Sequence, residues 1–204
     1  MFYEPKNNDH GLKYNPYKAI VAPRPIAWVS TRSPEGGDNL GPYSFFNAMS
    51  DMPPMLGFNS GPAKLGIDEP KDSVTNIRET GEFVVNIVSA ELMDAMNTSS
   101  FHFHHGVDEF AKAGLAKSEA KLVNAPMVAD SPVNLECKLH DILELPAPGH
   151  AKWIIGEVIG IHIKDEFIDG DFVRTGAWRP VSRLGYKEYA VVENVIELER
   201  PKHV

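Results

Sequence analysis

The amino-acid sequence predicts a mainly β fold, an antiparallel barrel into which a few short helices are inserted. Sixteen glycines and sixteen prolines are scattered through the 204 residues, which is typical of many short strands joined by turns. The apolar segments are short and rich in β-branched and aromatic residues, and helical periodicity is brief. A hydrophobic content of 43% is enough for a real core, so we expect one domain spanning residues 1–204.

Three strands are expected in the first part of the chain. Residues 18–33 form an apolar segment, and the turn-like sequence SPEGGD at 33–38 separates it from a second strand at 39–50. After Pro53 and Pro54, a third strand covers residues 55–60. Three neighbouring strands of this kind favour an antiparallel meander, which commonly curls into a barrel.

The first of these segments, IVAPRPIAWVST, has an unusual start. Pro23 and Pro25 flank Arg24. Proline cannot donate to a sheet ladder, and it restricts the residue before it to extended conformations. The two prolines therefore predict that Arg24 is held extended at the beginning of a strand.

At residues 71–81 the spacing of the apolar residues changes from that of a strand to that of a helix. Val74 and Ile77 are three residues apart, Asp72 or Ser73 can cap the first turn, and Gly81 stands where a C-terminal glycine cap belongs.

The rest of the chain alternates between strands and short helices. We expect a strand at 82–88, helices at 89–97 and 107–115, and long strands at 133–145 and 151–168.

Charge and composition exclude several classes of partner. The net charge of −8 argues against nucleic acid. The single cysteine, Cys137, excludes an intramolecular disulfide and fits a reducing compartment. We see neither an apolar secretory signal nor a segment long enough to cross a membrane. The sequence therefore predicts a cytoplasmic protein.

Common catalytic and nucleotide-binding motifs are absent from the sequence. A Walker-like match at residues 61–66 lacks the lysine and hydroxyl residue that a phosphate loop needs. There is no G-x-G-x-x-G for a Rossmann site and no G-x-S-x-G for a serine hydrolase.

A histidine-rich segment, FHFHHG, contains His102, His104 and His105. On a strand, His102 and His104 would share one face and could bind a metal together with Asp108 or Glu109. The alternative is a polar loop between two short helices, with the histidines on its surface.

Residues that can donate hydrogen bonds to an anion are concentrated between Asn59 and Asn76, just before the expected helix and within its first turn. They are Ser60, Gly61, Lys64, Lys71, Ser73 and Asn76. A helix N-terminus favours phosphate through its free N–H groups and its dipole. Asp72, however, could cap those N–H groups itself and repel a phosphate.

The second strand combines aromatic residues with hydroxyl and amide groups at Tyr43, Ser44, Phe45, Phe46 and Asn47. Core packing and contact with a planar ligand both fit this composition.

Seven segments together resemble one family. In order along the chain they are PRPIAWVST, NLGPYSFFNAMSDMPPM, KDSVTNIRETGEFVVNIV, VDEFAKAGL, SPVNLECKL, IGEVIGIHI and PVSRLGYKEY. This order resembles that of the flavin reductase-like proteins, which include flavoredoxins and ferric reductases, over about residues 15–190.

The resemblance implies a split β-barrel that binds FMN non-covalently, usually as a homodimer with the flavin near the subunit interface. It also implies that NADH or NADPH reduces the flavin without a dedicated nucleotide fold. By the same resemblance, the phosphate-binding residues are Ser60, Lys71 and Ser73, with Asn76 nearby. The residues implied beside the ring and ribityl chain are Arg24, Trp28, Ser30, Thr31, Ser44, Asn47, Met49, Ser50 and Arg183.

The sequence departs from the family pattern at two places. The helix begins with KDS where relatives often have threonine as the third residue, so the hydroxyl is kept. The FHFHHG loop replaces a proline-containing segment with fewer histidines.

The expected activity is NAD(P)H-dependent flavin reduction, in which nicotinamide C4 gives a hydride to flavin N5 and no side chain needs to take a proton. Arg24 or Arg183 could favour the anionic reduced flavin. Arg24 could instead be a surface residue, and Arg183 could pair with Glu188 or Asp171.

The expected electron acceptor is a partner oxygenase or a metal complex. The alternatives are a flavoredoxin-type electron-transfer protein with little NAD(P)H turnover, and a barrel without flavin that binds metal through His102 and His104.

Overall fold

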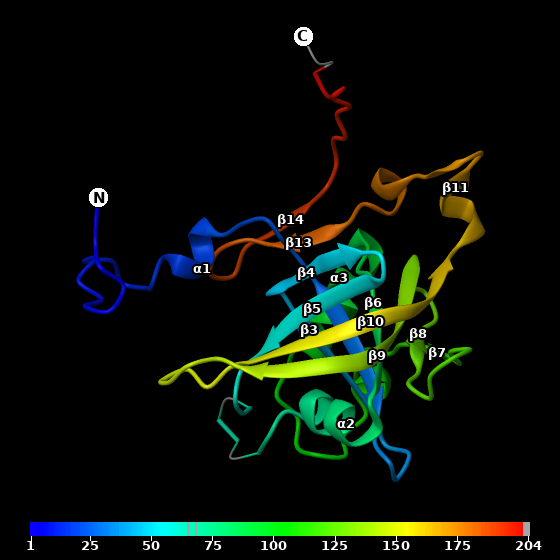
Figure 1. Ribbon diagram of the computed structural model, residues 1–204, viewed down its shortest axis with the longest axis horizontal. Helices are drawn as coiled ribbons and strands as arrows, with labels where there is room; N and C mark the ends of the chain where they lie inside the picture. Colours follow the sequence, from blue (N-terminus) through cyan, green and yellow to red (C-terminus); the bar gives the residue numbers. More distant parts are fainter. Residues whose placement is uncertain (65, 68, 202–204) are drawn as a thin grey trace.

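The computed structural model describes residues 1–64, 66–67 and 69–201 and is built on a curled, seven-stranded antiparallel sheet (Figure 1). Its strand order is β3-β2-β6-β9-β10-β5-β4. These strands are β2 (Ala27–Arg32), β3 (Asp38–Tyr43), β4 (Phe46–Asp51), β5 (Pro54–Ser60), β6 (Glu82–Asn86), β9 (Val133–Glu144) and β10 (Lys152–Ile163). The prediction of a mainly β, antiparallel fold is confirmed.

The predicted strand at 39–50 is in fact two strands, and the predicted meander is wrong. The ladder of β3 ends at Tyr43 and β4 begins at Phe46, yet the two strands lie at opposite edges of the sheet. Each edge strand forms a hairpin with its neighbour, β3 with β2 and β4 with β5. Because only Ser44 and Phe45 connect β3 to β4, the two edges of the sheet must come close together, and the sheet curls.

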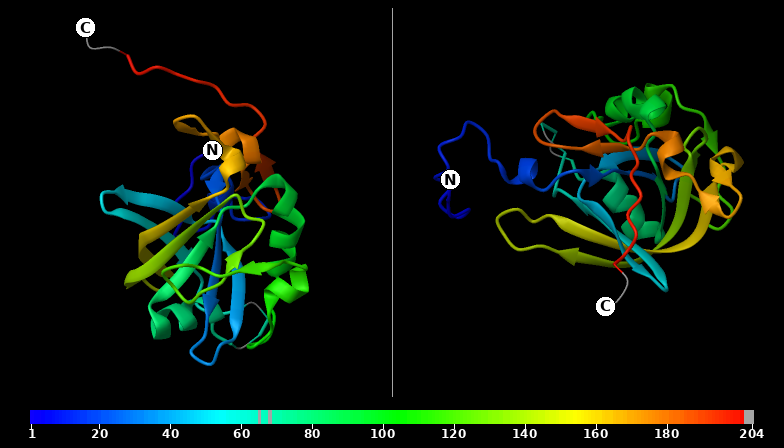
Figure 2. Two further views of the ribbon diagram at one scale, coloured as in Figure 1. Left: turned by 90° about the vertical axis from the view of Figure 1, so that its right-hand side faces the viewer. Right: turned by 90° about the horizontal axis from the view of Figure 1, so that it is seen from above.

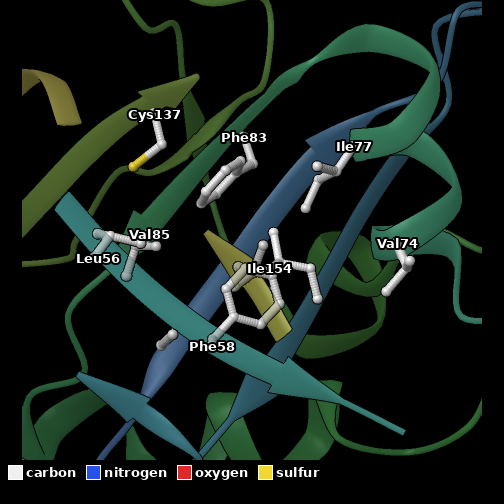
Figure 3. Packing of buried hydrophobic residues seen from close by; sticks show 10 residues of the cluster. Leu56, Phe58, Val74, Ile77, Phe83, Val85, Cys137 and Ile154 are labelled. Atoms are coloured by element: carbon white, nitrogen blue, oxygen red, sulfur yellow. The ribbon is translucent and has the colours of Figure 1, made fainter. Parts of the chain in front are cut away.

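The inside of the curl holds the main core (Figure 3). Its buried side chains come from five strands and from α2 (Asp72–Thr80), and they are Ala27, Val29, Leu56, Phe58, Val74, Ile77, Phe83, Val85, Cys137 and Ile154. At Gly156 an added Cβ would lie 2.4 Å from Cζ of Phe83. Glycine at this position therefore lets the backbone of β10 pack closely against the Phe83 ring.

The helix α2 lies across one end of the sheet and forms as the sequence predicts (Figure 1). Gly81 ends it in the left-handed conformation, with φ of 72°, and donates its N–H to the carbonyl of Ile77. The N-cap is Lys71, and no side chain caps the first turn. The prediction that Asp72 or Ser73 caps the helix is therefore wrong, because both side chains bind elsewhere.

A second, three-stranded sheet contains β1 (Arg24–Pro25), β13 (Val181–Arg183) and β14 (Tyr189–Val191). The predicted strand at 18–33 is thus a short helix, α1 (Tyr17–Ile20), followed by β1 and β2 in different sheets. Pro23 and Pro25 have no N–H to donate, which suits β1 to an edge position. β1 is indeed an edge strand of this sheet.

The remaining elements are short. They are η1 (Ala90–Leu92), α3 (Met93–Ser99), α4 (Glu109–Ala113), β7 (Lys117–Ser118), β8 (Met127–Val128), η2 (Asp165–Phe167), β11 (Ile168–Asp169), β12 (Phe172–Val173) and η3 (Thr175–Trp178). The two helices predicted after β6 are confirmed, and Leu92 and Met96 pack inward against Trp28. None of the helices in the described ranges is long and apolar enough to cross a bilayer.

Candidate functional site

A small polar cavity of about 100 Å³ opens at the N-terminus of α2. β3, the first residues of α2, the loop that follows α3, and Glu109 form its walls. The sequence places Lys71 and Ser73 here because the helix begins between them.

Lys71 and Ser73 are oriented by neighbours from other elements. Nζ of Lys71 lies 2.9 Å from Nε2 of His102, and burial lowers the pKa of Lys71, with Lys64 adding to the effect. Oγ of Ser73 accepts from the hydroxyl of Tyr43 at 2.9 Å and donates to Oδ1 of Asn39 at 2.7 Å. The cavity therefore has both a cationic side and a hydroxyl side.

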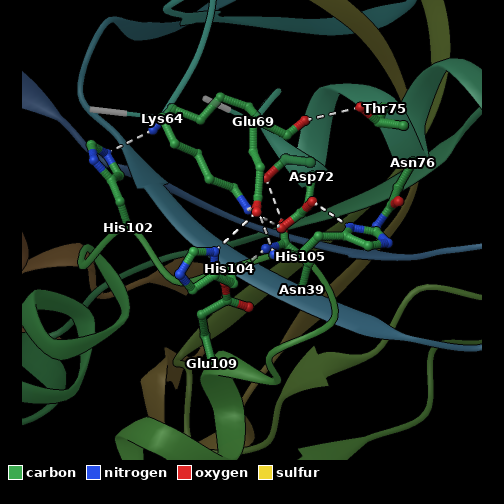
Figure 4. A network of polar contacts seen from close by, with 12 residues as sticks. Asn39, Lys64, Glu69, Asp72, Thr75, Asn76, His102, His104, His105 and Glu109 are labelled. Carbon is green, nitrogen blue, oxygen red and sulfur yellow. Dashed lines mark hydrogen bonds and ion pairs between the residues drawn. The ribbon is translucent and has the colours of Figure 1, made fainter. Parts of the chain in front are cut away.

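An ion network with the buried pair Lys64–Asp72 at its centre lies beside this cavity (Figure 4). Nζ of Lys64 lies 2.8 Å from Asp72 and 3.2 Å from Glu69. His105 contacts Asp72 at 2.8 Å, and His104 contacts Glu69 at 3.0 Å. Since Asp72 is paired with Lys64 and His105, its carboxylate does not cap the first turn of α2.

Glu109 is a second buried carboxyl group in the wall. Its two oxygens accept from Nδ2 of Asn39 and from the backbone N–H of Leu40, both at 3.0 Å. Burial nevertheless outweighs these hydrogen bonds and raises the pKa of Glu109 to about 7.

A larger groove of about 750 Å³ adjoins the small cavity. Its wall contains residues of β1, of β13 and of the β3–β4 connection. Pro42, Tyr43 and Ser100 belong to the walls of both cavities. The two spaces therefore lie side by side and together make up the candidate site, polar at the α2 end and broad and aromatic at the other.

Arg24 lies in the wall of this groove and is not a surface residue. It is 7% exposed, and its guanidinium donates to the carbonyls of Lys18, Val21 and Leu184. Its Nε is buried and has no hydrogen-bond partner among the described residues. The guanidinium lies 5.5 Å from the centre of the Phe45 ring.

Arg183 lies opposite Arg24, because β1 and β13 pair with these two residues in register. It donates to the carbonyl of Tyr186 and stacks over the ring of Tyr189 at 4.4 Å. In the described part of the chain no carboxylate lies within ion-pair distance of Arg183, so the predicted alternative of a bridge to Glu188 or Asp171 is wrong.

Comparison with known proteins identifies the fold and the family. The family model "Flavin reductase like domain" matches residues 21–177. This protein belongs to the flavin reductase-like family. An uncharacterised protein of Halalkalibacterium halodurans is 36% identical over 184 residues, which cover 89% of this chain and 87% of that protein.

Solved structures agree with this assignment. The flavin reductase-like chain is similar to Pseudomonas fluorescens 2-nitrobenzoate 2-nitroreductase, with 28% identity, a TM-score of 0.86, and 98% and 96% of the two chains covered. Component B of the Bacillus cereus nitrilotriacetate monooxygenase is 26% identical, with a TM-score of 0.88, and the match covers 97% of this chain and 98% of that one. A Shewanella frigidimarina protein with a split barrel domain shares the fold at 20% identity and a TM-score of 0.85, covering 98% and 100%. The predicted split β-barrel is confirmed.

Four residues predicted from the resemblance lie inside the flavin reductase-like fold, with partners of their own. Nε1 of Trp28 donates to Oγ of Ser99 at 2.8 Å, and Oγ of Ser30 donates to the carbonyl of Pro126 at 2.5 Å. Nδ2 of Asn76 donates to Oγ1 of Thr31 at 2.9 Å. Trp28, Ser30, Thr31 and Asn76 line neither cavity.

The other predicted residues divide between the site and the sheet edge. The structure brings Arg24, Ser44 and Arg183 into the groove and Lys71 and Ser73 into the small cavity. Ser60 is buried at the end of β5 and donates to the carbonyl of Gly61 at 3.2 Å. Asn47, Met49 and Ser50 are exposed on the edge strand β4 and line neither cavity.

Several wall residues of the small cavity were not expected as binding residues, among them Asn39, Ser100 and Glu109. Asn39 begins NLGPYSFF, one of the segments that carry the family resemblance, so the sequence offered a reason to include it among the binding residues. Glu109 was considered only as a metal ligand, and nothing local distinguishes Ser100, because only the tertiary structure brings the loop after α3 to this cavity.

The FHFHHG segment is a loop and not a strand. His102, His104 and His105 contact Lys71, Glu69 and Asp72 respectively. The described ranges contain no group of three or more His, Cys, Asp or Glu residues that could hold a metal ion. A metal function based on His102 and His104 therefore has no support in this geometry.

Proposed function

We propose that this flavin reductase-like protein binds FMN non-covalently across these two adjoining spaces and acts as an NAD(P)H-dependent flavin reductase. The observation that carries the proposal is the shape and polarity of the site. A small cationic end joins a broad aromatic end through Pro42, Tyr43 and Ser100. An elongated molecule with a phosphate at one end and a flat ring at the other fits this division.

The donor set suits a phosphate at the α2 end. Lys71 supplies a charge, Ser73 supplies a hydroxyl, and the first turn of α2 has no side-chain cap. The ion pair with Lys64 offsets part of the charge of Asp72 and so weakens its repulsion of an anion. In this proposal Ser44 and Tyr43 lie along the sugar-alcohol chain.

Bound FMN would supply the redox chemistry by accepting a hydride from NADH or NADPH at N5. The protein's residues have to bind, orient and exclude water. Tyr43 and Phe45 contribute aromatic walls, while Arg24 and Arg183 add positive potential at the broad end.

The acceptor of the electrons distinguishes two versions of this function. One structural neighbour is named as component B of a monooxygenase, which supports delivery of reduced flavin to a partner oxygenase. Another is named as a nitroreductase of an aromatic acid, which supports reduction of an acceptor within the groove. A metal complex is a further candidate acceptor.

The decisive experiment is anaerobic. We expect the purified protein to bind FMN and the flavin absorbance to bleach within seconds of mixing with NADH or NADPH. Flavin binding without bleaching by either nucleotide would instead support the flavoredoxin-type alternative. Failure to bind FMN would contradict both.

Lys71→Met tests the assignment of the phosphate end. Loss of one charge-assisted contact should weaken FMN binding roughly tenfold or more and leave riboflavin binding unchanged, because riboflavin has no phosphate. Lys112→Met, on the exposed face of α4, is the matched control. Equal losses for FMN and riboflavin would contradict the assignment.

We also propose that the protein is a cytoplasmic homodimer. Its N-terminal segment and C-terminal tail lie outside the curled sheet (Figure 2). Both segments carry exposed apolar side chains, among them Phe2, Tyr14, Ile20 and Ile196. A monomeric mass in solution with flavin bound would contradict the dimer.

A further inference from the structure

We propose that Arg24 and Arg183 form a subsite for the carboxylate of a planar aromatic acid, which binds in the large groove beside the flavin. The inference rests on the proposed function only for the presence of that flavin. The two arginines and the groove belong to the protein chain itself, so the subsite can be tested with and without FMN.

The first support is the charge of the groove. Its wall contains three cationic residues, Lys18, Arg24 and Arg183, and no aspartate or glutamate among the described residues that line it. The whole chain has a net charge of −8. An acidic protein that keeps carboxylates out of the wall of this groove has a local positive potential there, which favours an anionic ligand.

The second support is the pairing of the arginines. In the β1–β13 ladder Arg24 is the register partner of Arg183, so the two side chains leave the same face of the ribbon. Like charges directly opposite each other destabilise a strand pair. Burial, and after it the charge of Arg183, lowers the pKa of Arg24. No described carboxylate relieves this repulsion, whereas a bound anion would.

The third support is the orientation of the two guanidinium groups. Three backbone carbonyls, those of Lys18, Val21 and Leu184, hold Arg24, while its buried Nε has no partner among the described residues. Arg183 is fixed over the ring of Tyr189. Both groups are thus positioned before a ligand arrives, which lowers the entropic cost of binding.

The remaining walls define the ligand class. Phe45 lies under Arg24, and Tyr186 and Tyr189 flank Arg183, so flat apolar surface surrounds the cations. A volume of about 750 Å³ lies within the usual range for small-molecule sites. A carboxylate on an aromatic ring satisfies both the cations and the ring surfaces, and a guanidinium binds a carboxylate with directional hydrogen bonds.

The test uses benzoate and its uncharged analogue benzamide, titrated by calorimetry into the FMN-loaded and the flavin-free protein. We expect benzoate to bind more tightly than benzamide. In Arg183→Gln, benzoate binding should weaken roughly tenfold or more, whereas benzamide binding should change less than about twofold. Arg174→Gln is the matched control, because Arg174 is an exposed residue paired with Asp169 and lies outside the groove.

Arg24→Lys is the second variant. It keeps the charge but cannot reproduce the donor geometry, so it should weaken benzoate binding while the protein stays folded. Titration with ADP tests whether the arginines bind the phosphates of a pyridine nucleotide instead of the carboxylate of an aromatic acid. Tighter binding of ADP than of benzoate, lost in Arg183→Gln, would overturn the proposal in favour of a nucleotide site.

Two further results would also overturn it. One is the absence of a benzoate preference over benzamide in the wild-type protein. The other is an Arg183→Gln variant in which FMN affinity falls and benzoate affinity does not, which would mean that the arginines face the flavin. Failure of the proposed function looks different, because the protein would then bind benzoate in an Arg183-dependent way but would not bind FMN.

Discussion

The two ends of the site differ in whether their charged side chains have ion-pair partners. At the α2 end, Lys64 is buried against Asp72 and Glu69, and His104 and His105 add to the same network. At the groove end, Arg24 and Arg183 face each other without a described carboxylate partner. At the α2 end the network pairs its charges with one another, while the groove end has an excess of positive charge.

This difference separates charges that support the structure from charges available to a ligand. A buried ion pair contributes little net stability when intact, but removing one partner leaves an uncompensated buried charge. Two like charges on a ribbon already repel, so removing one costs little. Removing a cation should therefore lower the free energy of unfolding far more at the α2 end than at the groove end.

The largest effect is expected for Lys64→Met. It leaves Asp72, whose side chain is 8% exposed, without its main cationic partner. We expect a loss of about 3–5 kcal/mol in the free energy of unfolding, measured by urea denaturation.

Two variants control for this effect. Adding Asp72→Asn should recover part of the lost stability, because the unpaired charge is gone. Lys138→Met removes a 57% exposed side chain 4.0 Å from Glu82 and should cost less than about 1 kcal/mol. Equal losses from Lys64→Met and Lys138→Met would mean that the buried network does not support the α2 end.

A smaller effect is expected from the titration of Glu109. Burial raises its pKa in the folded state from 4.5 to about 7. A raised carboxyl pKa contributes stability that is fully present below the unfolded value of about 4.5 and is lost as the pH rises through about 7. The shift corresponds to roughly 3 kcal/mol between acidic and alkaline conditions.

Glu109→Gln should remove this part of the pH dependence. The measurement is the free energy of unfolding between about pH 4.5 and about pH 8. Glu35→Gln, in the exposed turn after β2, should leave the wild-type profile unchanged. A Glu109→Gln profile that still falls by the full amount would show that another group carries the titration.

The smallest effect is expected at the groove. Arg183→Gln loses a hydrogen bond to the carbonyl of Tyr186 and stacking on Tyr189, but it also removes the repulsion with Arg24. These contributions oppose each other, so the free energy of unfolding should change by less than about 1 kcal/mol. A loss comparable to that of Lys64→Met would show that Arg183 has a structural role, and the contrast between the two ends would disappear.

Much of the local structure could be predicted from the sequence, because it depends on neighbours along the chain. The helix at 71–81 follows from its apolar period and from Gly81, whose φ of 72° suits glycine. The strands β6, β9 and β10 follow from runs of β-branched residues. The resemblance to flavin reductase-like proteins also brought Lys71, Ser73, Arg24, Ser44 and Arg183 into the candidate set.

The errors came from interactions between distant segments. Trp28, Ser30 and Thr31 were expected beside a ligand, yet β2 is buried on both faces, and these side chains bond to Ser99, Pro126 and Asn76. The expected caps failed for a similar reason: Asp72 pairs with Lys64 and His105, and Ser73 bonds to Asn39 and Tyr43.

Local sterics and the periodicity of apolar residues specify most of the extended and helical segments of this chain and the residues that can be buried. The tertiary structure alone decided that β3 and β4 lie at opposite edges of the sheet and that Arg24 lies opposite Arg183. A period of two specifies the faces of a strand but not its partner. Strand pairing instead follows from how the sheet curls to bury one common core.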